Sequence, residues 1–244
     1  MNLQKTKGIV LNQFKYSETS IIVNILTEDF GKMSFIVNGV RKKKSKFPAN
    51  YFQAFNIIHL VFIQSSKSDL HRIIEINNIT LLEQIIFNLH KSSVCMFLAE
   101  IIHLSYNSSE KDKKLYQFLE NIIQFIDSTP TTEIVNIHLW TLLRLMQFSG
   151  IAPENNYSEE KPYFDALNGS FTDNKNKNRD IYNLKHSNTI SLLLSSKVED
   201  NSKIKINRVE RQELLNLMIH YFQIHLNTFK TSRSLDILSE IFED

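Results

Sequence analysis

The sequence predicts an α+β, multi-domain protein in which a five-stranded β-barrel is followed by an all-helical domain. Two patterns support this prediction. Apolar and polar residues alternate over the first 80 residues, whereas apolar residues recur at three- and four-residue intervals later in the chain. The 244 residues are 42% apolar and 22% charged, which is ordinary globular composition. This length suits two modest domains, which we place at residues 1–80 and 81–244.

The predicted barrel consists of five short runs rich in β-branched and aromatic residues. They are residues 8–14, 20–27, 32–38, 55–64 and 70–77. A turn at 28–31 makes the second and third runs a hairpin, and a polar turn at 65–69 joins the last two. Five strands in so short a segment suit a small closed barrel better than a sandwich of seven or more strands.

The helical pattern begins after Thr80. One helix face recurs over residues 115–126, and helical spacing returns over 214–226 and 235–242. Thr131–Glu133, just after Pro130, predicts the start of a helix that runs to Phe148 and is apolar nearly all round. We expect Gly150 to end this central helix, and residues 151–186 to form a polar interlude.

The sequence gives no support for an enzyme or a cofactor. It contains no glycine-rich phosphate loop, no dinucleotide fingerprint and no nucleophile elbow. His220 and His225 are five residues apart, so they do not share one face of a helix and cannot bind one metal. A single cysteine, Cys95, excludes an intramolecular disulfide. With no apolar run of about 20 residues and no signal peptide, we expect a cytoplasmic protein.

Positive charge is concentrated in the first third of the chain. Residues 1–80 hold 11 Lys and Arg against 5 Asp and Glu, and the remainder holds 17 against 21. The segment Arg41–Lys46 places five cations in six residues, and such a run gains affinity for phosphates by releasing counterions. Phe47 and Tyr51 follow it and offer rings on which bases stack. The alternative is a solvated loop that contacts nothing.

The candidate DNA-binding residues all lie in the first 80 residues. The basic loop contributes Arg41, Lys42, Lys43, Lys44 and Lys46, and the rest of the predicted barrel contributes Lys5, Lys7, Lys15 and Arg72. Phe14 and Tyr16 are further candidates for stacking on bases, although we expect Phe14 to pack in the core.

Several short motifs, in order, resemble the RecO family of bacterial recombination mediators. In the first third these are Lys7–Leu11, Tyr16–Glu18, Leu26–Lys32 and the basic stretch Gly39–Phe47. Later motifs are Gly150–Pro153, Tyr163–Asp165, Gly169, Phe171, Tyr221, His225, Leu226, Ser234, Leu235 and Leu238. The resemblance covers nearly the whole chain and implies that the barrel is an OB-fold.

The resemblance also implies an insert in the helical domain, which in many members is a zinc finger. Residues 151–186 contain no cysteine and one histidine, His186, so we expect no zinc site and no cofactor. In its place we predict a small apolar hairpin with strands at 163–165 and 170–172 and with Tyr157 packed alongside.

The function implied by the resemblance is non-enzymatic DNA repair in the bacterial cytoplasm, associated with the nucleoid. The family binds single- and double-stranded DNA, anneals complementary strands and, with RecR, assists RecA loading onto strands coated by single-stranded DNA-binding protein. Arg144, a charge inside the apolar central helix, is a candidate for binding a partner; a buried structural ion pair is the alternative. Two other interpretations stay open: a generic single-strand-binding OB protein without mediator activity, and a structural protein whose basic loop only confers solubility.

Overall fold

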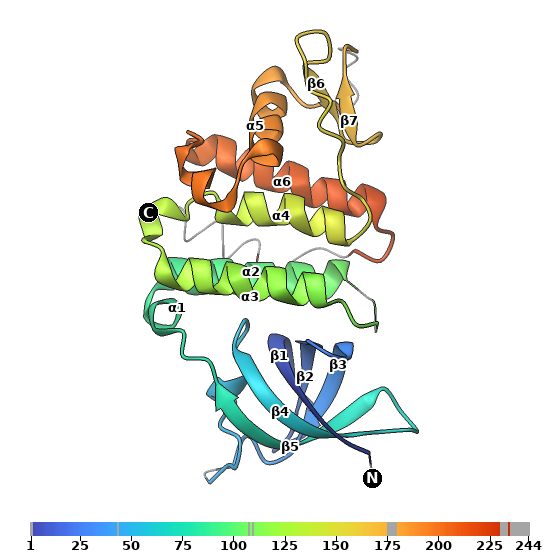
Figure 1. The fold of residues 1–244 in the computed structure, drawn as a ribbon, viewed down its shortest axis with the longest axis vertical. Helices are drawn as coiled ribbons and strands as arrows, with labels where there is room; N and C mark the ends of the chain where they lie inside the picture. The colour runs from blue at the N-terminus through green and yellow to red at the C-terminus, as the bar shows by residue number, and fades with distance from the viewer. Residues whose placement is uncertain are drawn as a thin grey trace. The chain divides into compact units, whose positions relative to one another are not determined.

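A computed structural model describes residues 2–42, 44–106, 108, 110–174, 180–229 and 234 of the chain. The chain forms two compact units, Met1–Ser128 and Thr129–Asp244 (Figure 1). The first unit contains strands β1 to β5 and helices α1 to α3. The domain boundary expected at residue 80 stays a prediction. Among the described residues, none of the helices combines the length and the apolar character needed to cross a membrane.

The first unit begins with a closed five-stranded barrel in the order β1-β2-β3-β5-β4, which is the OB-fold topology. The strands are β1 (Asn2–Lys15), β2 (Ile21–Thr27), β3 (Gly31–Val37), β4 (Ile57–Gln64) and β5 (Leu70–Ile79). β3 and β5 pair in parallel, and the other neighbours are antiparallel. The predicted fold class is confirmed.

The first strand is about twice as long as the sequence predicts. Its first half pairs with β4, from Asn2 opposite Gln64 onward, and its second half pairs with β2. A β-bulge between Val10 and Asn12 separates the register of the second half from that of the first. One strand therefore serves two neighbours, and the bulge changes which residues face inward.

The loop between β3 and β4 is anchored in the barrel core at several points. Val40 and Phe47, which bracket the basic run, are both buried, as is Phe52 in the short 3₁₀ helix η1 (Ala49–Phe52). All three side chains belong to the same apolar cluster as Phe35 of β3. Buried side chains therefore hold both ends of the basic run against the barrel.

Helices α1 (Glu83–Phe87), α2 (Leu89–Ser105) and α3 (Lys113–Ser128) complete the first unit. The stripe predicted over 115–126 is confirmed in α3. On the barrel, Lys32 donates to the carbonyl oxygens of His103 and Tyr106 at 2.7 and 2.8 Å, at the C-terminal end of α2. Burial of this ammonium lowers the pKa of Lys32 to about 8.

The second unit contains α4 (Ile137–Phe148), α5 (Leu184–Ser195) and α6 (Arg208–His225). The 3₁₀ segment η2 (Thr131–Glu133) precedes α4, and a second one, η3 (Val198–Lys203), lies between α5 and α6. The central helix predicted from Thr131 begins only at Ile137, because residues 131–133 form a separate 3₁₀ turn. It ends as predicted: Gly150 has φ +73°, and Ile151 N–H donates to the Met146 carbonyl at 2.9 Å.

The spacing over 214–226 is confirmed in α6, although the helix starts earlier and ends at His225. The predicted stripe over 235–242 lies outside the described residues. Helix α5 begins inside the stretch expected to be a polar interlude; Asn183 caps it by accepting the His186 N–H at 2.8 Å.

The apolar hairpin predicted in place of a zinc finger is present as β6 (Tyr163–Asp165) and β7 (Ser170–Thr172). Phe164 and Phe171 are buried with ring centroids 5.1 Å apart, and Tyr157 packs edge-on against Phe171 at 5.3 Å. Within the described ranges, no three His, Cys, Asp or Glu side chains gather as a metal site. Aromatic packing thus holds the strands of this insert together.

Candidate nucleic-acid interface

Four side chains form a row across the outer face of the barrel. The strand register places Phe14 opposite Ile22, Ile22 opposite Ile36, and Ile36 opposite Arg72. Directly opposed residues point to the same side of a sheet, with Cβ atoms about 5 Å apart. Phe14 is 50% exposed, Arg72 is exposed and the two isoleucines are half-buried. We call these four residues the outer row; it presents a ring, two aliphatic side chains and a guanidinium to solvent.

A second, polar row lies beside it on the same face. Asn24 donates to Asn12 Oδ1 at 2.6 Å, and Ser34 donates to Asn24 Oδ1 at 2.6 Å. These residues lie two positions along their strands from members of the outer row, so they share its side of the sheet. Because their polar groups bond to one another, this polar row is held in a fixed arrangement.

The basic loop lies next to the β1–β2 turn. Arg41 N–H donates to the Thr19 carbonyl at 3.3 Å, and Lys42 N–H closes a turn on the Gly39 carbonyl at 3.1 Å. Gly39 has φ +74°, a conformation that favours glycine. The side chains of Arg41, Lys42 and Lys44 are exposed, whereas Lys43 lies outside the described residues.

Lys46 differs from the other cations of the loop. Its Nζ donates to the Ile74 carbonyl of β5 at 2.8 Å and lies 5.2 Å from the centroid of the Phe47 ring. This lysine therefore helps to fix the end of the loop against the barrel.

The structure reverses the expected roles of the aromatic residues. Phe47, predicted to stack on bases, is only 7% exposed in the barrel core, and Tyr51 is half-buried against the same cluster. Phe14, expected in the core, lies outside. The bulge between Val10 and Asn12 explains this: it shifts the alternation by one residue, so Phe14 faces outward while Val10 faces inward. Tyr16, 59% exposed in the β1–β2 turn, stays available for stacking.

The remaining predicted cations of the barrel fall into two groups. Lys15 directly follows Phe14 and is exposed, and Arg72 belongs to the outer row. Lys5 and Lys7 lie on the half of β1 that pairs with β4, at least about 23 Å along the strand from Phe14. Lys7 also faces a carboxylate, with its Nζ 3.8 Å from Glu120 of α3. The structure does not bring these two lysines to the outer row.

Comparison with known proteins matches both parts of the chain to one family. The profile described as "Recombination protein O N terminal" matches residues 1–82, and the profile "Recombination protein O C terminal" matches residues 86–234. The chain belongs to the RecO family. The "DNA repair protein RecO" of Phocaeicola vulgatus is 32% identical over 240 residues, which are 98% of this chain and 99% of the relative. That of Flavobacterium johnsoniae is 33% identical over 98% of both chains, and that of Bacteroides fragilis is 31% identical over 99% and 100%.

In this member of the RecO family, Arg144 serves the helical unit itself. Its Nη2 donates to the carbonyl oxygens of Leu194 and Ser196 at 3.0 and 2.9 Å, at the C-terminal end of α5. The guanidinium also lies 4.7 Å from the Trp140 ring, and burial lowers its pKa. The partners are backbone carbonyls, not the carboxylate that a structural ion pair requires. A role for Arg144 in binding a partner stays a prediction.

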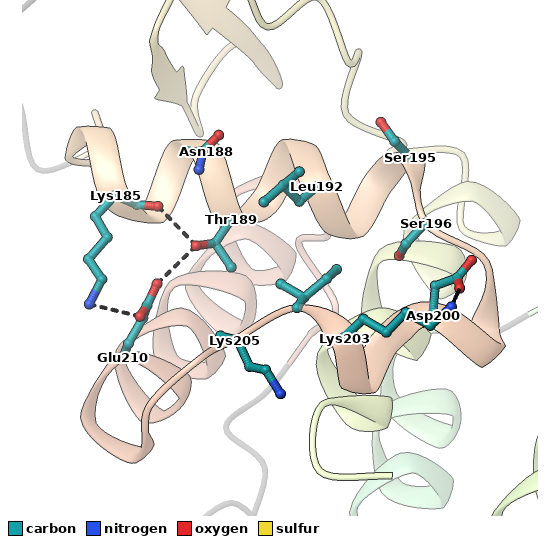
Figure 2. A pocket seen from close by; sticks show the side chains of 11 residues that line it. Lys185, Asn188, Thr189, Leu192, Ser195, Ser196, Asp200, Lys203, Lys205 and Glu210 are labelled. Carbon is teal, nitrogen blue, oxygen red and sulfur yellow. Dashed lines mark hydrogen bonds and ion pairs between the residues drawn. The ribbon is translucent and has the colours of Figure 1, made fainter. Parts of the chain in front are cut away.

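A pocket of about 510 Å³ lies between α5 and η3 in the helical unit (Figure 2). Its two carboxylates are both paired: Glu210 with Lys185 at 2.8 Å, and Asp200 with Lys203 at 2.6 Å. Lys205 adds a third ammonium to the lining, and the lining also includes Leu192.

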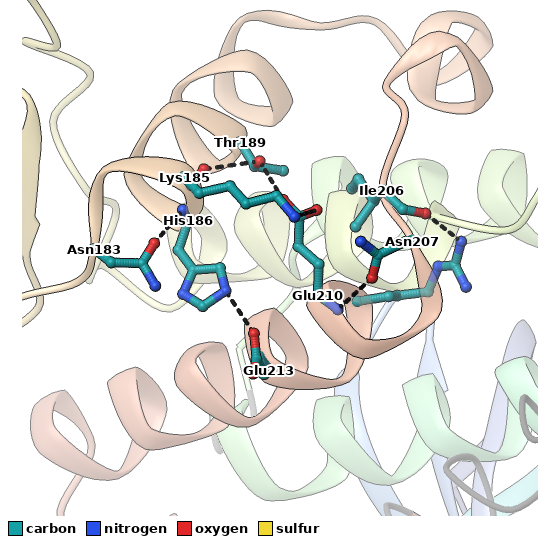
Figure 3. Close-up of polar contacts among 9 residues, drawn as sticks. Asn183, Lys185, His186, Thr189, Ile206, Asn207, Glu210 and Glu213 are labelled. Atoms are coloured by element: carbon teal, nitrogen blue, oxygen red, sulfur yellow. Dashed lines mark hydrogen bonds and ion pairs between the residues drawn. The ribbon is translucent and has the colours of Figure 1, made fainter.

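Around this pocket, polar contacts tie α5 to α6 (Figure 3). Glu210 is buried and accepts from the Thr189 hydroxyl at 2.9 Å, and His186 Nε2 lies 2.9 Å from Glu213 Oε2. The side chain of Asn207 caps α6 by accepting the Glu210 N–H. These polar side chains are engaged in holding the two helices together, which makes the barrel face the stronger candidate for contact with DNA.

Proposed function

We propose that this protein binds single- and double-stranded DNA on the outer face of its barrel and anneals complementary strands without any covalent chemistry. With RecR, it assists RecA loading at strands coated by single-stranded DNA-binding protein. It acts in the cytoplasm, at the nucleoid. Membership of a family of DNA repair proteins supports this proposal at the level of the process.

The observation that carries the proposal is the outer row beside the basic loop. Phe14 and Tyr16 are large rings left in solvent at the edge of a face whose cations include Arg72 and Arg41. Cations attract the phosphates, and a ring holds a base by its face. A base held in that way keeps its pairing edge free, which annealing requires.

The polar row supports binding that does not depend on base sequence. Asn12, Asn24 and Ser34 bond to one another, so their groups are engaged within the protein. Phosphate contacts and stacking then dominate, and neither carries much sequence information. A protein that anneals any pair of complementary strands needs binding that does not depend on sequence.

The salt dependence of DNA binding tests the role of the basic loop. Each cation that meets a phosphate of a single strand contributes about −0.7 to the slope of log affinity against log salt. Arg41, Lys42 and Lys44 replaced together by Gln should therefore flatten the slope by up to about 2. The matched control replaces Lys114, Lys161 and Lys197, which are exposed elsewhere, and should leave the slope near that of wild type. If both folded variants have the same slope, the basic loop is only a solvated loop and does not contact the phosphates.

Annealing on protein-coated strands separates a mediator from a generic single-strand binder. Wild type should anneal complementary strands that carry single-stranded DNA-binding protein, and RecR should change the rate of RecA loading on them. Phe14→Ala should slow annealing with bare strands while the salt slope is kept, because stacking is lost and phosphate contacts are not. DNA binding without annealing would favour the generic OB protein.

A further inference from the structure

A pocket continues the outer face of the barrel at the end of β3 farthest from the basic loop. It has a volume of about 750 Å³, within the range of ligand sites, and is lined by the start of β3, the β4–β5 turn and Lys111. Ser34 belongs both to the polar row and to the wall of this pocket. At about 3.3 Å per residue, Lys32 in its wall and Asn38 before the basic loop are about 20 Å apart along β3.

The charges of this pocket favour an anion. Its charged lining consists of Lys32, Lys67, Lys111, Asp29 and Asp69. Lys111 Nζ lies 2.7 Å from Asp29 Oδ1 and holds the pKa of that carboxyl below its usual range. Lys67 is exposed in the β4–β5 turn, and no carboxylate within the described ranges pairs with it. Three ammonium groups line the pocket against two carboxylates. Because Lys32 is held by the carbonyls of His103 and Tyr106, the exposed Lys67 is the cation of the lining that can turn toward an anion.

The uncharged part of the lining includes the serines of the β4–β5 turn. Ser65 and Ser68 are engaged within the turn, where Ser65 Oγ accepts the Lys67 and Ser68 N–H groups and Ser68 Oγ donates to the Leu70 carbonyl. Ser66 adds a hydroxyl to the lining. The Phe30 ring is engaged elsewhere, because it packs edge-on against Phe62 of the core at 5.4 Å. An ammonium group and a hydroxyl suit the oxygens of a phosphate.

The buried histidine of the pocket fixes the start of the β4–β5 turn. His71 Nδ1 accepts the Ser65 N–H at 3.1 Å, and the ring packs against Phe35 and Phe62 of the core. Burial lowers the pKa of His71.

We propose that this pocket, the β4–β5 pocket, holds a phosphate of the same single strand whose bases lie on the outer row. The inference rests on the proposed function and adds a path to it. The strand enters at the basic loop, crosses the row that contains Phe14 and Ile36, and leaves over the β4–β5 turn. Lys111, which follows α2, completes a site that the barrel strands alone would not form.

Oligonucleotide length provides the test, because only a long strand reaches both ends of the face. Wild type and Lys67→Gln are compared on oligothymidylates of about 4 and about 16 nucleotides, the limits of OB-fold site sizes. Lys67→Gln should flatten the salt slope by about 0.7 on the long strand and leave it unchanged on the short one. Lys114→Gln, the same charge change on α3, should change neither.

A second variant adds repulsion. Ser66→Asp places a carboxylate in the exposed turn and should weaken long-strand binding more than Lys67→Gln does, with Gln117→Glu on α3 as the charge-matched control. If both pocket variants bind like their controls while the basic-loop variant binds weakly, the β4–β5 pocket holds no phosphate and the inference is overturned. If the basic-loop variant also binds like wild type, the proposed function itself fails.

A 5′-phosphate on the oligonucleotide distinguishes a phosphate within the strand from a phosphate at its end. The long oligothymidylate is used with and without a 5′-phosphate. Equal effects of Lys67→Gln on both forms assign the pocket to an internal phosphodiester, whereas an effect restricted to the phosphorylated form assigns it to a strand end. Both results support a phosphate in the pocket.

Discussion

Several cations of the helical unit differ in their contacts from the cations of the basic loop. In the helical unit, Arg144 binds the last carbonyls of α5, Arg211 donates to the Ile206 carbonyl at 2.9 Å, and Lys203 pairs with Asp200. In the barrel, Arg41 and Lys42 stand exposed on a loop, and no carboxylate in the described part of the chain neutralises them.

Some of these charges stabilise the fold, whereas others leave its stability unchanged or lower it. A guanidinium on buried carbonyls satisfies groups that would otherwise be unpaired, so its removal destabilises the protein. Adjacent exposed lysines repel one another and contribute nothing to folding. A cluster of such cations, as in the basic loop, suits a polyanionic ligand outside the chain.

The largest expected effect comes from one substitution made in both units. Leu143→Asp buries a charge in α4, where Leu143 is 2% exposed, and should lower the free energy of unfolding by about 3–5 kcal/mol. Ile22→Asp on the half-buried outer row should cost about 1 kcal/mol, because water reaches the carboxylate. Chemical denaturation measures both. Similar losses would show that the outer row is a packed surface, not an open one.

Arg144→Met should come next, with a loss of about 1.5–3 kcal/mol. Methionine keeps much of the volume but leaves the carbonyls of Leu194 and Ser196 without their charged donor. Lys42→Met, the comparable change in the barrel, should stay within about 0.5 kcal/mol. A stable Arg144→Met protein would release this guanidinium for the predicted contact with a partner.

Acid should destabilise the helical unit through His138. Burial, assisted by Arg211, lowers the pKa of His138 to about 3, below the ordinary value of 6.5 in the unfolded chain. As the pH falls below 6.5 the unfolded chain binds a proton that the folded unit does not, so stability falls until the pH reaches about 3. The loss at pH 5 is about 2 kcal/mol. His138→Gln should remove this part of the pH dependence. Denaturation measured between pH 7 and pH 5 tests it, because this range crosses the ordinary pKa of 6.5 and stays above the folded value of about 3. An unchanged dependence would place its origin in other groups, such as His103, whose pKa burial lowers to about 4.

The smallest expected effect on stability belongs to the basic loop. Gln at positions 41, 42 and 44 should leave the melting temperature unchanged or slightly raised, because like charges are removed from a surface. Calorimetry beside the DNA-binding assay tests this. A large fall in melting temperature would mean that the loop cations stabilise the barrel, and the contrast between the units would disappear.

Local patterns in the sequence predict the strands and the apolar hairpin, because alternation and turn residues are local properties. They miss the first half of β1, where Lys5 and Lys7 mask the pattern and pairing with β4 decides the structure. They also fail for Phe14 and Phe47. A bulge and a folded-back loop set the exposure of these rings, and both depend on contacts with residues far away in the sequence.

The bulge in β1 has a consequence for how this surface tolerates change. The register passes from Val10 opposite Ile25 to Asn12 opposite Asn24, so Leu11 is the residue that has no partner on β2. Deletion of Leu11 would therefore make the pairing regular and leave Phe14 opposite Ile22. Insertion of one residue between Asn12 and Gln13 would instead place Gln13 opposite Ile22 and turn Phe14 to the other side of the sheet. The outer row would then carry an amide where it now carries a ring.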